Sequence, residues 1–294
     1  MKQFLSLTAL FLASASFAAT PIDETIDADS AQTLDVSNIL GSVSVIGTVG
    51  DAVRIQGSLA DEAEALDVRR EGSRIVVHVI YPQSGRRFGA NEGTVLEITA
   101  PPGLDVSIST VSARITLGEM RGEQRLESVS GSIETTVFDD EVSAMTTSGR
   151  IAIHGNDANT RAAVSSVSGR VELAALGGEV NAQTVSGSIE LRSGGLDRAE
   201  LKSVSGSISV EAALTGNGRI NAVTTSGRIS LDLNGSPAGA YELATLSGSI
   251  DNCFGPEVAR PQFGPPSSTL RFEETDANTQ VFVNSMSGSI EICK

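Results

Sequence analysis

Few residues in this chain have a type and spacing that could support catalysis or metal binding. The two histidines, His78 and His154, are far apart, and neither has a second ligand residue at a spacing that would hold a metal ion. We therefore expect structural or surface roles for both. The acidic run Asp139-Asp140-Glu141 carries the carboxylates that glycoside hydrolysis requires, but its position predicts a short solvated turn.

A second group of candidate residues recurs at regular spacing. Arginine directly follows a Ser-Gly or Ser-Ala pair at Arg114, Arg150, Arg170 and Arg228. Glutamate stands at position +3 from the glycine at Glu134, Glu172 and Glu190. We expect these charges to point outward and to form ion pairs between neighbouring copies, each of which contributes little stability. An anion-binding ladder at Arg150 and Arg170 is the alternative. The serines before the glycines are too many to be nucleophiles, and no base stands beside them.

These residues belong to a repeat built on the tetrapeptide Ser-Gly-Ser-Ile and its variants. The glycines of the clear copies are Gly131, Gly149, Gly169, Gly187, Gly206, Gly227, Gly248 and Gly288, and Ala113 replaces glycine in an earlier copy. Successive copies are 18 to 21 residues apart, except for a last step of 40 residues. A period near 20 residues is typical of a solenoid, in which each copy forms one rung.

The apolar pattern around each glycine predicts two strands per copy. Counted from the glycine as zero, position −5 is always apolar, position +2 is always Ile or Val, and position +4 is apolar in seven of nine copies. Apolar residues two positions apart indicate strands, and the glycine marks a corner where a sharp turn or a close backbone approach excludes a Cβ. Stacked at ~4.8 Å, nine rungs would form a rod of roughly 43 Å with a column of isoleucines inside.

The sequence leaves open the direction of two positions beside the corner. Position −3 is Ser or Thr in every copy, and position −2 is Val, Thr, Leu or Met. Both cannot point inward on a regular strand that also buries position −5. The preferred interpretation is a bend near position −3 that turns position −2 inward. The alternative leaves Val129, Val167, Val185, Val204 and Leu246 as an exposed apolar stripe, which would be a candidate binding face.

The two cysteines, Cys253 and Cys293, both stand at position +5 of their copies. Equivalent positions stack in a solenoid, and the cysteines of an exported protein usually pair. A disulfide needs Cα atoms within about 7 Å of each other, which adjacent rungs at ~4.8 Å satisfy. We therefore predict a disulfide, with residues 254–282 as an inserted loop. A metal or redox site is the alternative, but it would lack a nearby histidine and Cys-x-x-Cys spacing.

Residues 1–19 have the pattern of a secretory signal peptide. Lys2 precedes an apolar run over residues 4–13, and residues 16–18 form a small-x-small cleavage site. The apolar run is too short to span a bilayer. We therefore expect export to the periplasm, with the cell surface or the medium as alternatives.

Composition limits the classes of partner. The formal charge is −15, from 36 acidic and 21 basic residues, which argues against nucleic acid and anionic membranes. Aromatic residues make up 4 % of the chain and tryptophan is absent, so few side chains can stack on sugars or bases.

The regular copies follow a less regular β lead-in over residues 20–107. Within it, residues 34–45 form a degenerate copy, residues 52–59 and 94–99 predict strands, and residues 66–80 predict a hairpin. We expect an all-β, single-stranded β-solenoid (β-helix) over residues 108–294, with rungs of 18–21 residues.

The chain resembles the bacterial putative-adhesin family. The resemblance rests on the Val/Thr-Ser-Gly-Ser/Arg-Ile rungs, on the strand at residues 96–101 followed by Gly103, and on the opening segment 38–43, and it covers roughly residues 30–294. That family is a domain of unknown function with β-strand repeats in cell-envelope proteins. The resemblance implies a β-solenoid and carries over no catalytic residue.

We therefore expect a non-enzymatic envelope protein, adhesive or scaffolding, without a cofactor, catalytic residue or metal. Its partner would be an envelope or surface ligand, and its open terminal rung would allow end-to-end self-association. The alternative is a carbohydrate-active β-helix enzyme, a polysaccharide lyase or hydrolase, which would need facing carboxylates in a groove walled by long loops.

Overall fold

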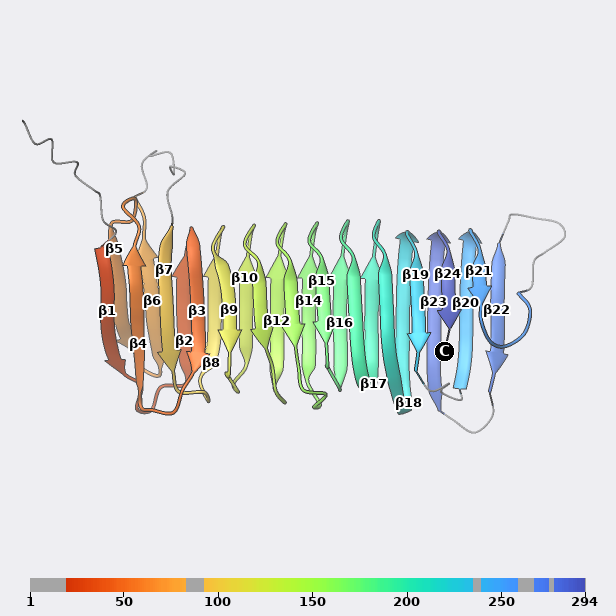
Figure 1. The fold of residues 1–294 in the computed structure, drawn as a ribbon, viewed down its shortest axis with the longest axis horizontal. Coiled ribbons are helices and arrows are strands. Elements are labelled where there is room, and N and C mark those ends of the chain that lie inside the picture. The colour runs from red at the N-terminus through yellow and green to blue at the C-terminus, as the bar shows by residue number, and fades with distance from the viewer. Residues whose placement is uncertain (1–19, 83–92, 235–238, 259–266, 275–277, 294) are drawn as a thin grey trace, which may run out of the picture.

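The chain folds as a β-solenoid. A computed structural model describes residues 20–82, 93–234, 239–258, 267–274 and 278–293, and within these ranges all regular structure is β-strand. The strands lie side by side along a straight rod, with β1 (Thr20–Asp27) at one end and β22 (Ser268–Glu273) at the other (Figure 1). The expected fold class is confirmed, whereas the expected signal peptide at residues 1–19 lies outside the described residues.

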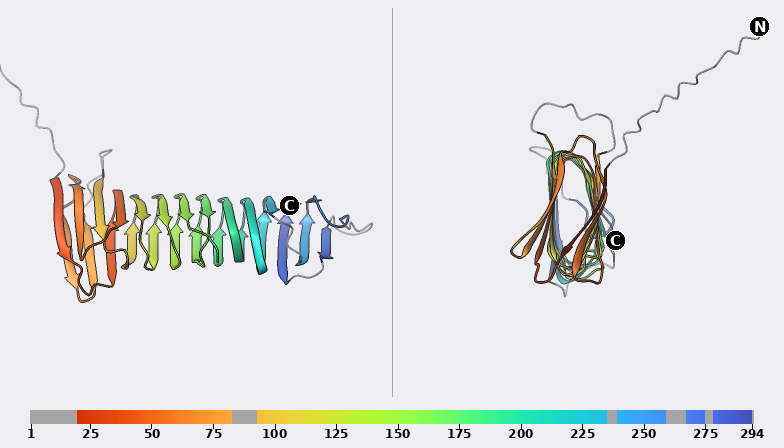
Figure 2. Two further views of the ribbon diagram at one scale, coloured as in Figure 1. Left: turned by 60° about the horizontal axis from the view of Figure 1, so that its bottom comes forward. Right: turned by 90° about the vertical axis from the view of Figure 1, so that its left-hand side faces the viewer.

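Each rung contributes one strand to each of two faces, and the two faces enclose a flattened cross-section (Figure 2). The first face holds the strands that precede the corners, all paired in parallel. In stacking order they are β2 (Thr33–Asn38), β8 (Asp105–Thr110), β10 (Gln124–Ser128), β12 (Glu141–Thr146), β14 (Arg161–Ser166), β16 (Glu179–Thr184), residues 198–203 of β17 (Ile189–Ser203), residues 219–226 of β18 (Ile208–Ser226), β23 (Thr279–Ser287) and β20 (Gly239–Ser247).

The second face holds the strands that follow the corners, again paired in parallel. In the same order they are β3 (Gly41–Gly47), β9 (Arg114–Gly118), β11 (Ile133–Thr136), β13 (Ile151–His154), β15 (Val171–Ala174), residues 189–193 of β17, residues 208–212 of β18, β19 (Ile229–Leu233), β24 (Ile290–Cys293) and β21 (Ile250–Asn252). Strands β17 and β18 continue through the turn opposite the corner, so each contributes to both faces.

The core is a column of like side chains between the two faces. Ile189, Ile208 and Ile229 are direct partners on successive rungs, and each is at most 1 % exposed. Position −5 on the opposite face is buried in the same way, for example at Leu201 and Ala222. Burial of about 1.5–3 kcal/mol per large apolar side chain, repeated in every rung, stabilises the stack.

The last rung of the chain is not the last rung of the stack. Strands β23 and β24 pair with β18 and β19 on one side and with β20 and β21 on the other, so the rung of Gly288 lies between those of Gly227 and Gly248. The segment 254–282, expected as a loop, is partly strand: β22 (Ser268–Glu273) pairs antiparallel with β20, and β23 begins at residue 279. The strand β22 covers the edge that β20 would otherwise expose.

The other end of the rod is built in a similar way. The rung of β2 and β3 lies between β8–β9 and the strands β6 (Arg74–Ile80) and β7 (Thr94–Ala100). Antiparallel strands then complete the end: β5 (Ala65–Glu71) pairs with β6, β4 (Ala52–Leu59) with β7, and β1 (Thr20–Asp27) with β4. The first and the last complete rungs of the chain are therefore both enclosed by neighbours.

Candidate functional site

The corner of each rung is closed by close backbone contact between successive glycines. A Cβ on Gly187 would clash with the carbonyl oxygen of Gly169, and a Cβ on Gly206 would clash with that of Gly187. All eight corner glycines meet the carbonyl of the neighbouring rung in this way. All eight lie in the described ranges and none of them has a positive φ, so close approach excludes the side chain there.

Position −3 points inward, and at five corners its hydroxyl accepts a hydrogen bond from the backbone N–H of the glycine. The backbone N–H of Gly131 donates to Ser128 Oγ at 2.8 Å, and that of Gly187 donates to Thr184 Oγ1 at 3.0 Å. The bond recurs at Gly149, Gly169 and Gly206. A buried N–H without a partner is costly, so a small hydroxyl residue at this inward position has a clear structural role.

Position −2 therefore points outward, and the preferred interpretation from the sequence is wrong. The strand continues regularly through position −3, which is buried in every rung, and alternation then turns position −2 to solvent. Valine is more hydrophobic than serine or threonine, so hydrophobicity alone favours burial of position −2 over burial of position −3. The hydrogen bond to the corner N–H reverses that preference.

The outward residues form what we call the apolar stripe, a row along the rod beside the corners. Its apolar members are 44–56 % exposed: Val111, Val129, Val167, Val185, Val204, Met286 and Leu246, in stacking order. Thr147 and Thr225 occupy the same position in the two remaining rungs and are also exposed. Nine rungs at ~4.8 Å give the apolar stripe a length of roughly 38 Å.

The immediate borders of the apolar stripe are mostly uncharged. On the corner side lies the row of exposed serines at position −1, such as Ser168, Ser186 and Ser205. On the other side, position −4 carries residues such as Met145, which is 49 % exposed, and Gln183. An apolar row bordered by hydroxyl groups has the composition of a binding surface. A face that serves only to contact solvent usually carries charged residues instead.

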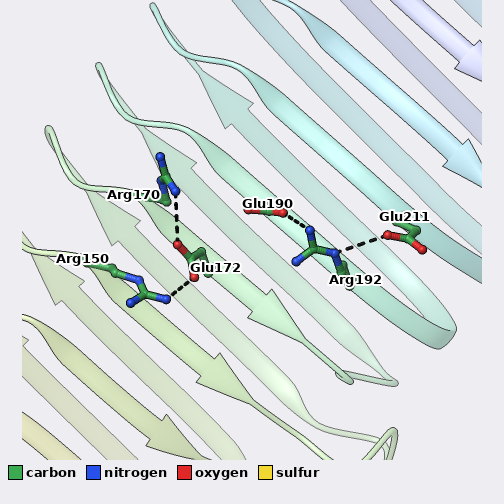
Figure 3. Close-up of polar contacts among 6 residues, drawn as sticks. All are labelled: Arg150, Arg170, Glu172, Glu190, Arg192 and Glu211. Atoms are coloured by element: carbon green, nitrogen blue, oxygen red, sulfur yellow. Dashed lines mark hydrogen bonds and ion pairs between the residues drawn. The ribbon is translucent and has the colours of Figure 1, made fainter.

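On the second face, the expected outward arginines and glutamates form ion pairs (Figure 3). Glu172 binds Arg150 of the preceding rung and lies 3.7 Å from Arg170 of its own rung. Arg192 binds Glu190 and lies 3.3 Å from Glu211 of the next rung. The alternative of an anion-binding ladder at Arg150 and Arg170 is thus opposed by a carboxylate that already lies between them.

Glu172 is the carboxylate most affected by this arrangement. The hydrogen bond from Arg150 lowers the pKa of Glu172 below its ordinary value, burial acts in the opposite direction, and the charge of Arg170 lowers it further. The same pair raises the pKa of Arg150. Glu172 therefore stays ionised at neutral pH and neutralises part of the arginine row.

The other outward charges lie apart from one another. Arg228 donates to Ser289 Oγ at 3.3 Å, Arg114 is exposed at the first regular corner, and Glu134 is exposed on β11. Glu134 lies near enough to Arg150 to raise the pKa of that guanidinium slightly.

Cys253 and Cys293 are joined in a disulfide, with Cα atoms 4.9 Å apart. They follow β21 and end β24, which are direct neighbours, so the bond links the outermost complete rung to the inserted one. The out-of-order stacking explains how cysteines 40 residues apart meet.

The histidines and the acidic run lie in separate places. His78 is exposed on β6 and His154 is exposed at the end of β13. Asp139 and Asp140 are exposed in the turn before β12, and Glu141 lies 3.2 Å from Arg161. Among the described residues, no group of three or more His, Cys, Asp and Glu side chains is placed to hold a metal ion.

Known proteins with similarity to the chain include one family and several solved structures. The family model described as Toastrack DUF4097 matches residues 16–293. Solved structures with similarity to the chain include a “putative adhesin” from Bacteroides fragilis (12 % identity, 94 % of this chain and 98 % of that chain, TM-score 0.48). Another is a “putative cell adhesion protein” from Clostridium sporogenes (10 % identity, 94 % and 99 %, TM-score 0.27). No curated protein matches the chain.

No helix in the described part of the chain is long and apolar enough to cross a membrane.

Proposed function

The chain belongs to the Toastrack DUF4097 family, and from this premise we propose that it is a non-enzymatic, exported binding rod of the cell envelope. In this proposal the rod holds an apolar protein surface along the apolar stripe. The leader-like pattern of residues 1–19 supports export, and the periplasm is the compartment we propose. The disulfide between Cys253 and Cys293 fits an oxidising compartment.

The observation that carries the proposal is the exposure of the apolar stripe. A soluble protein gains nothing from seven half-exposed aliphatic side chains in one straight row, because threonine occupies the same position in two rungs without disturbing the fold. Contiguous exposed apolar surface usually marks a place where another molecule binds. The rigid parallel stack holds the row straight, so a partner meets a preformed surface.

The chemistry of the apolar stripe favours a protein partner. Its side chains are aliphatic, and an aliphatic row without aromatic rings offers little for stacking on sugars. The formal charge of −15 disfavours an anionic bilayer surface. An apolar protein surface with polar groups at its rim would match both the valines and the neighbouring serines.

The test uses isosteric substitutions on three adjacent rungs. In the variant Val167→Thr, Val185→Thr, Val204→Thr, each side chain keeps its shape, and each added hydroxyl would need a hydrogen bond when a partner buries it. The control variant is Ile46→Thr, Val49→Thr, which replaces exposed aliphatic side chains with threonine outside the apolar stripe. Co-sedimentation with envelope fragments of the producing bacterium measures the apparent affinity, before and after proteolysis of the fragments.

We expect the triple variant to bind at least tenfold more weakly, the control to bind like the wild type, and proteolysed fragments to lose binding. Unchanged binding by the triple variant would rule out the apolar stripe as the contact surface. Binding that survives proteolysis and disappears after glycan digestion would contradict a protein partner.

A further inference from the structure

A polar groove runs along the edge of the rod opposite the corners. It has a volume of roughly 710 Å³ and is formed by the turns that join the second face of one rung to the first face of the next. Its lining residues are charged or carry hydroxyl and amide groups, apart from glycine. The apolar stripe lies beside the corners, at the other ends of the same strands, so the two surfaces are separate.

The charges in the groove have a definite order. At position −8, direct strand partners follow one another as Glu141, Arg161, Glu179, Arg198 and Arg219. At one end of this row Glu141 and Arg161 form an ion pair, and Glu179 follows. The other end has two adjacent arginines, Arg198 and Arg219. Neighbouring positions on parallel strands are ~4.8 Å apart, so the two cations repel each other.

Arg198 and Arg219 differ from most arginines in the described part of the chain. Nine arginines form ion pairs: Arg54, Arg69, Arg74, Arg125, Arg150, Arg161, Arg170, Arg192 and Arg271. Within the described ranges, neither Arg198 nor Arg219 has an ion pair or a side-chain hydrogen bond. The nearby carboxylate of Asp197 instead accepts a hydrogen bond from Thr215 Oγ1 at 2.8 Å.

We propose that this groove binds an oligosaccharide that carries isolated uronic-acid carboxylates, with one carboxylate held between Arg198 and Arg219. A guanidinium can donate two parallel hydrogen bonds to a carboxylate, and two adjacent guanidinium groups surround it. The bound anion would also remove the repulsion between the two arginines.

The acidic part of the groove lies on one side of the two arginines, where it fits the neutral sugars next to such a carboxylate. Glu179, Asp139 and Asp140 offer acceptors for sugar hydroxyls, and Asn159 and Asn217 offer both donors and acceptors. These carboxylates would repel a densely charged polyanion. They would also penalise a dianionic phosphate more than a monoanionic carboxylate, because the repulsion grows with the charge of the ligand.

A peptide fits the groove less well. Extended peptides are usually bound by addition to a sheet edge, with pockets for alternate side chains. This groove follows turns rather than a strand edge, and its walls offer no apolar pocket. The absence of aromatic residues from its lining means that affinity for a sugar would come from hydrogen bonds and charge.

The experiment is calorimetric titration of the mature protein with a hyaluronan hexasaccharide, in which uronate and N-acetylhexosamine alternate. The neutral comparison ligand is N-acetylchitohexaose, and inorganic phosphate is titrated separately. The groove variant is Arg198→Gln, Arg219→Gln. The matched control is Arg125→Gln, Arg271→Gln, which removes the same charge from exposed pairs outside the groove.

We expect the hexasaccharide to bind at least tenfold more tightly than N-acetylchitohexaose, and the groove variant to lose at least tenfold in affinity. The control should bind like the wild type, and so should the stripe variant Val167→Thr, Val185→Thr, Val204→Thr, since this site is independent of the apolar stripe. Equal binding of acidic and neutral sugars, equal binding by the groove variant, or tighter binding of inorganic phosphate would each overturn the proposal.

Discussion

Two small groups at the corner decide which way the neighbouring valine points. At five corners the hydroxyl at position −3 accepts a hydrogen bond from the N–H of the corner glycine, as Thr184 does for Gly187. The missing side chain of the glycine lets the carbonyl of the preceding rung approach. With position −3 held inward, Val185 must face solvent, where it is 45 % exposed.

The hydroxyl can be tested by an isosteric substitution. Thr184→Val keeps the shape of the side chain and removes the acceptor, which leaves a buried N–H unpaired. We expect a loss of about 1–3 kcal/mol in the free energy of unfolding, measured in urea. Thr184→Ser should retain most of the stability, and the exposed Thr225→Val should change it by less than about 0.5 kcal/mol. A stable Thr184→Val variant would show that the corner bond contributes nothing.

The close approach at the corner can be tested by adding one methyl group. In Gly187→Ala the new Cβ would clash with the carbonyl oxygen of Gly169, so two rungs must separate locally. We expect a loss of about 1–3 kcal/mol by thermal or urea unfolding. Gly195→Ala is the matched control, because no atom lies within 4 Å of its added Cβ. Equal stability of the two variants would contradict the account of the corner.

At the scale of the elements, the insertion of the last rung into the stack gives the C-terminal end its stability. Strands β23 and β24 form hydrogen bonds on both sides, and the disulfide fastens the outer rung of β20 and β21 to them. Because each rung contacts only its neighbours, a change at this end should stay local.

Removal of the disulfide tests this locality. In Cys253→Ser, Cys293→Ser the 40-residue loop is no longer closed, and the chain-entropy relation predicts a loss of about 3–4 kcal/mol. We expect hydrogen exchange to accelerate in β20 to β24 and to stay unchanged in β8 to β16. Reduction of the wild type should reproduce the pattern. Faster exchange along the whole rod would contradict the locality of the effect.

Sequence periodicity predicts the rungs well, and three features lie beyond it. The spacing of residues such as Ile189 and Ile208 predicts the core column, because like positions stack in a solenoid. The direction of Val185 depends on a backbone hydrogen bond, which hydrophobicity does not report. The place of the Gly288 rung depends on which neighbours it pairs with, and every copy carries the same pattern. The arginines of the polar groove stand outside the repeated tetrapeptide and were missed.

At the scale of the whole molecule, the solenoid separates different chemistry onto different sides. The apolar stripe follows the corners, the ion pairs of Figure 3 lie on the second face, and the polar groove follows the opposite turns. Because the rungs stack in register, equivalent residues of successive rungs form a row along the rod. The residue type at one repeat position therefore decides whether that side of the rod is apolar, charged or polar. A rod of this kind presents several surfaces at fixed distances from one another.

Position −2 forms one straight outward row, in the order set by the strand pairing. Distances between nitroxide labels test this arrangement. One pair of labels is placed at Val111 and Leu246, and the other at Val111 and Met286. The labels are attached through unnatural amino acids, so the native cysteines stay in their disulfide. We predict single narrow distributions near ~38 Å for Val111–Leu246 and near ~34 Å for Val111–Met286. A Val111–Met286 distance longer than the Val111–Leu246 distance would contradict the stacking order. Broad distance distributions from labels that are immobilised inside the protein would contradict the straight outward row.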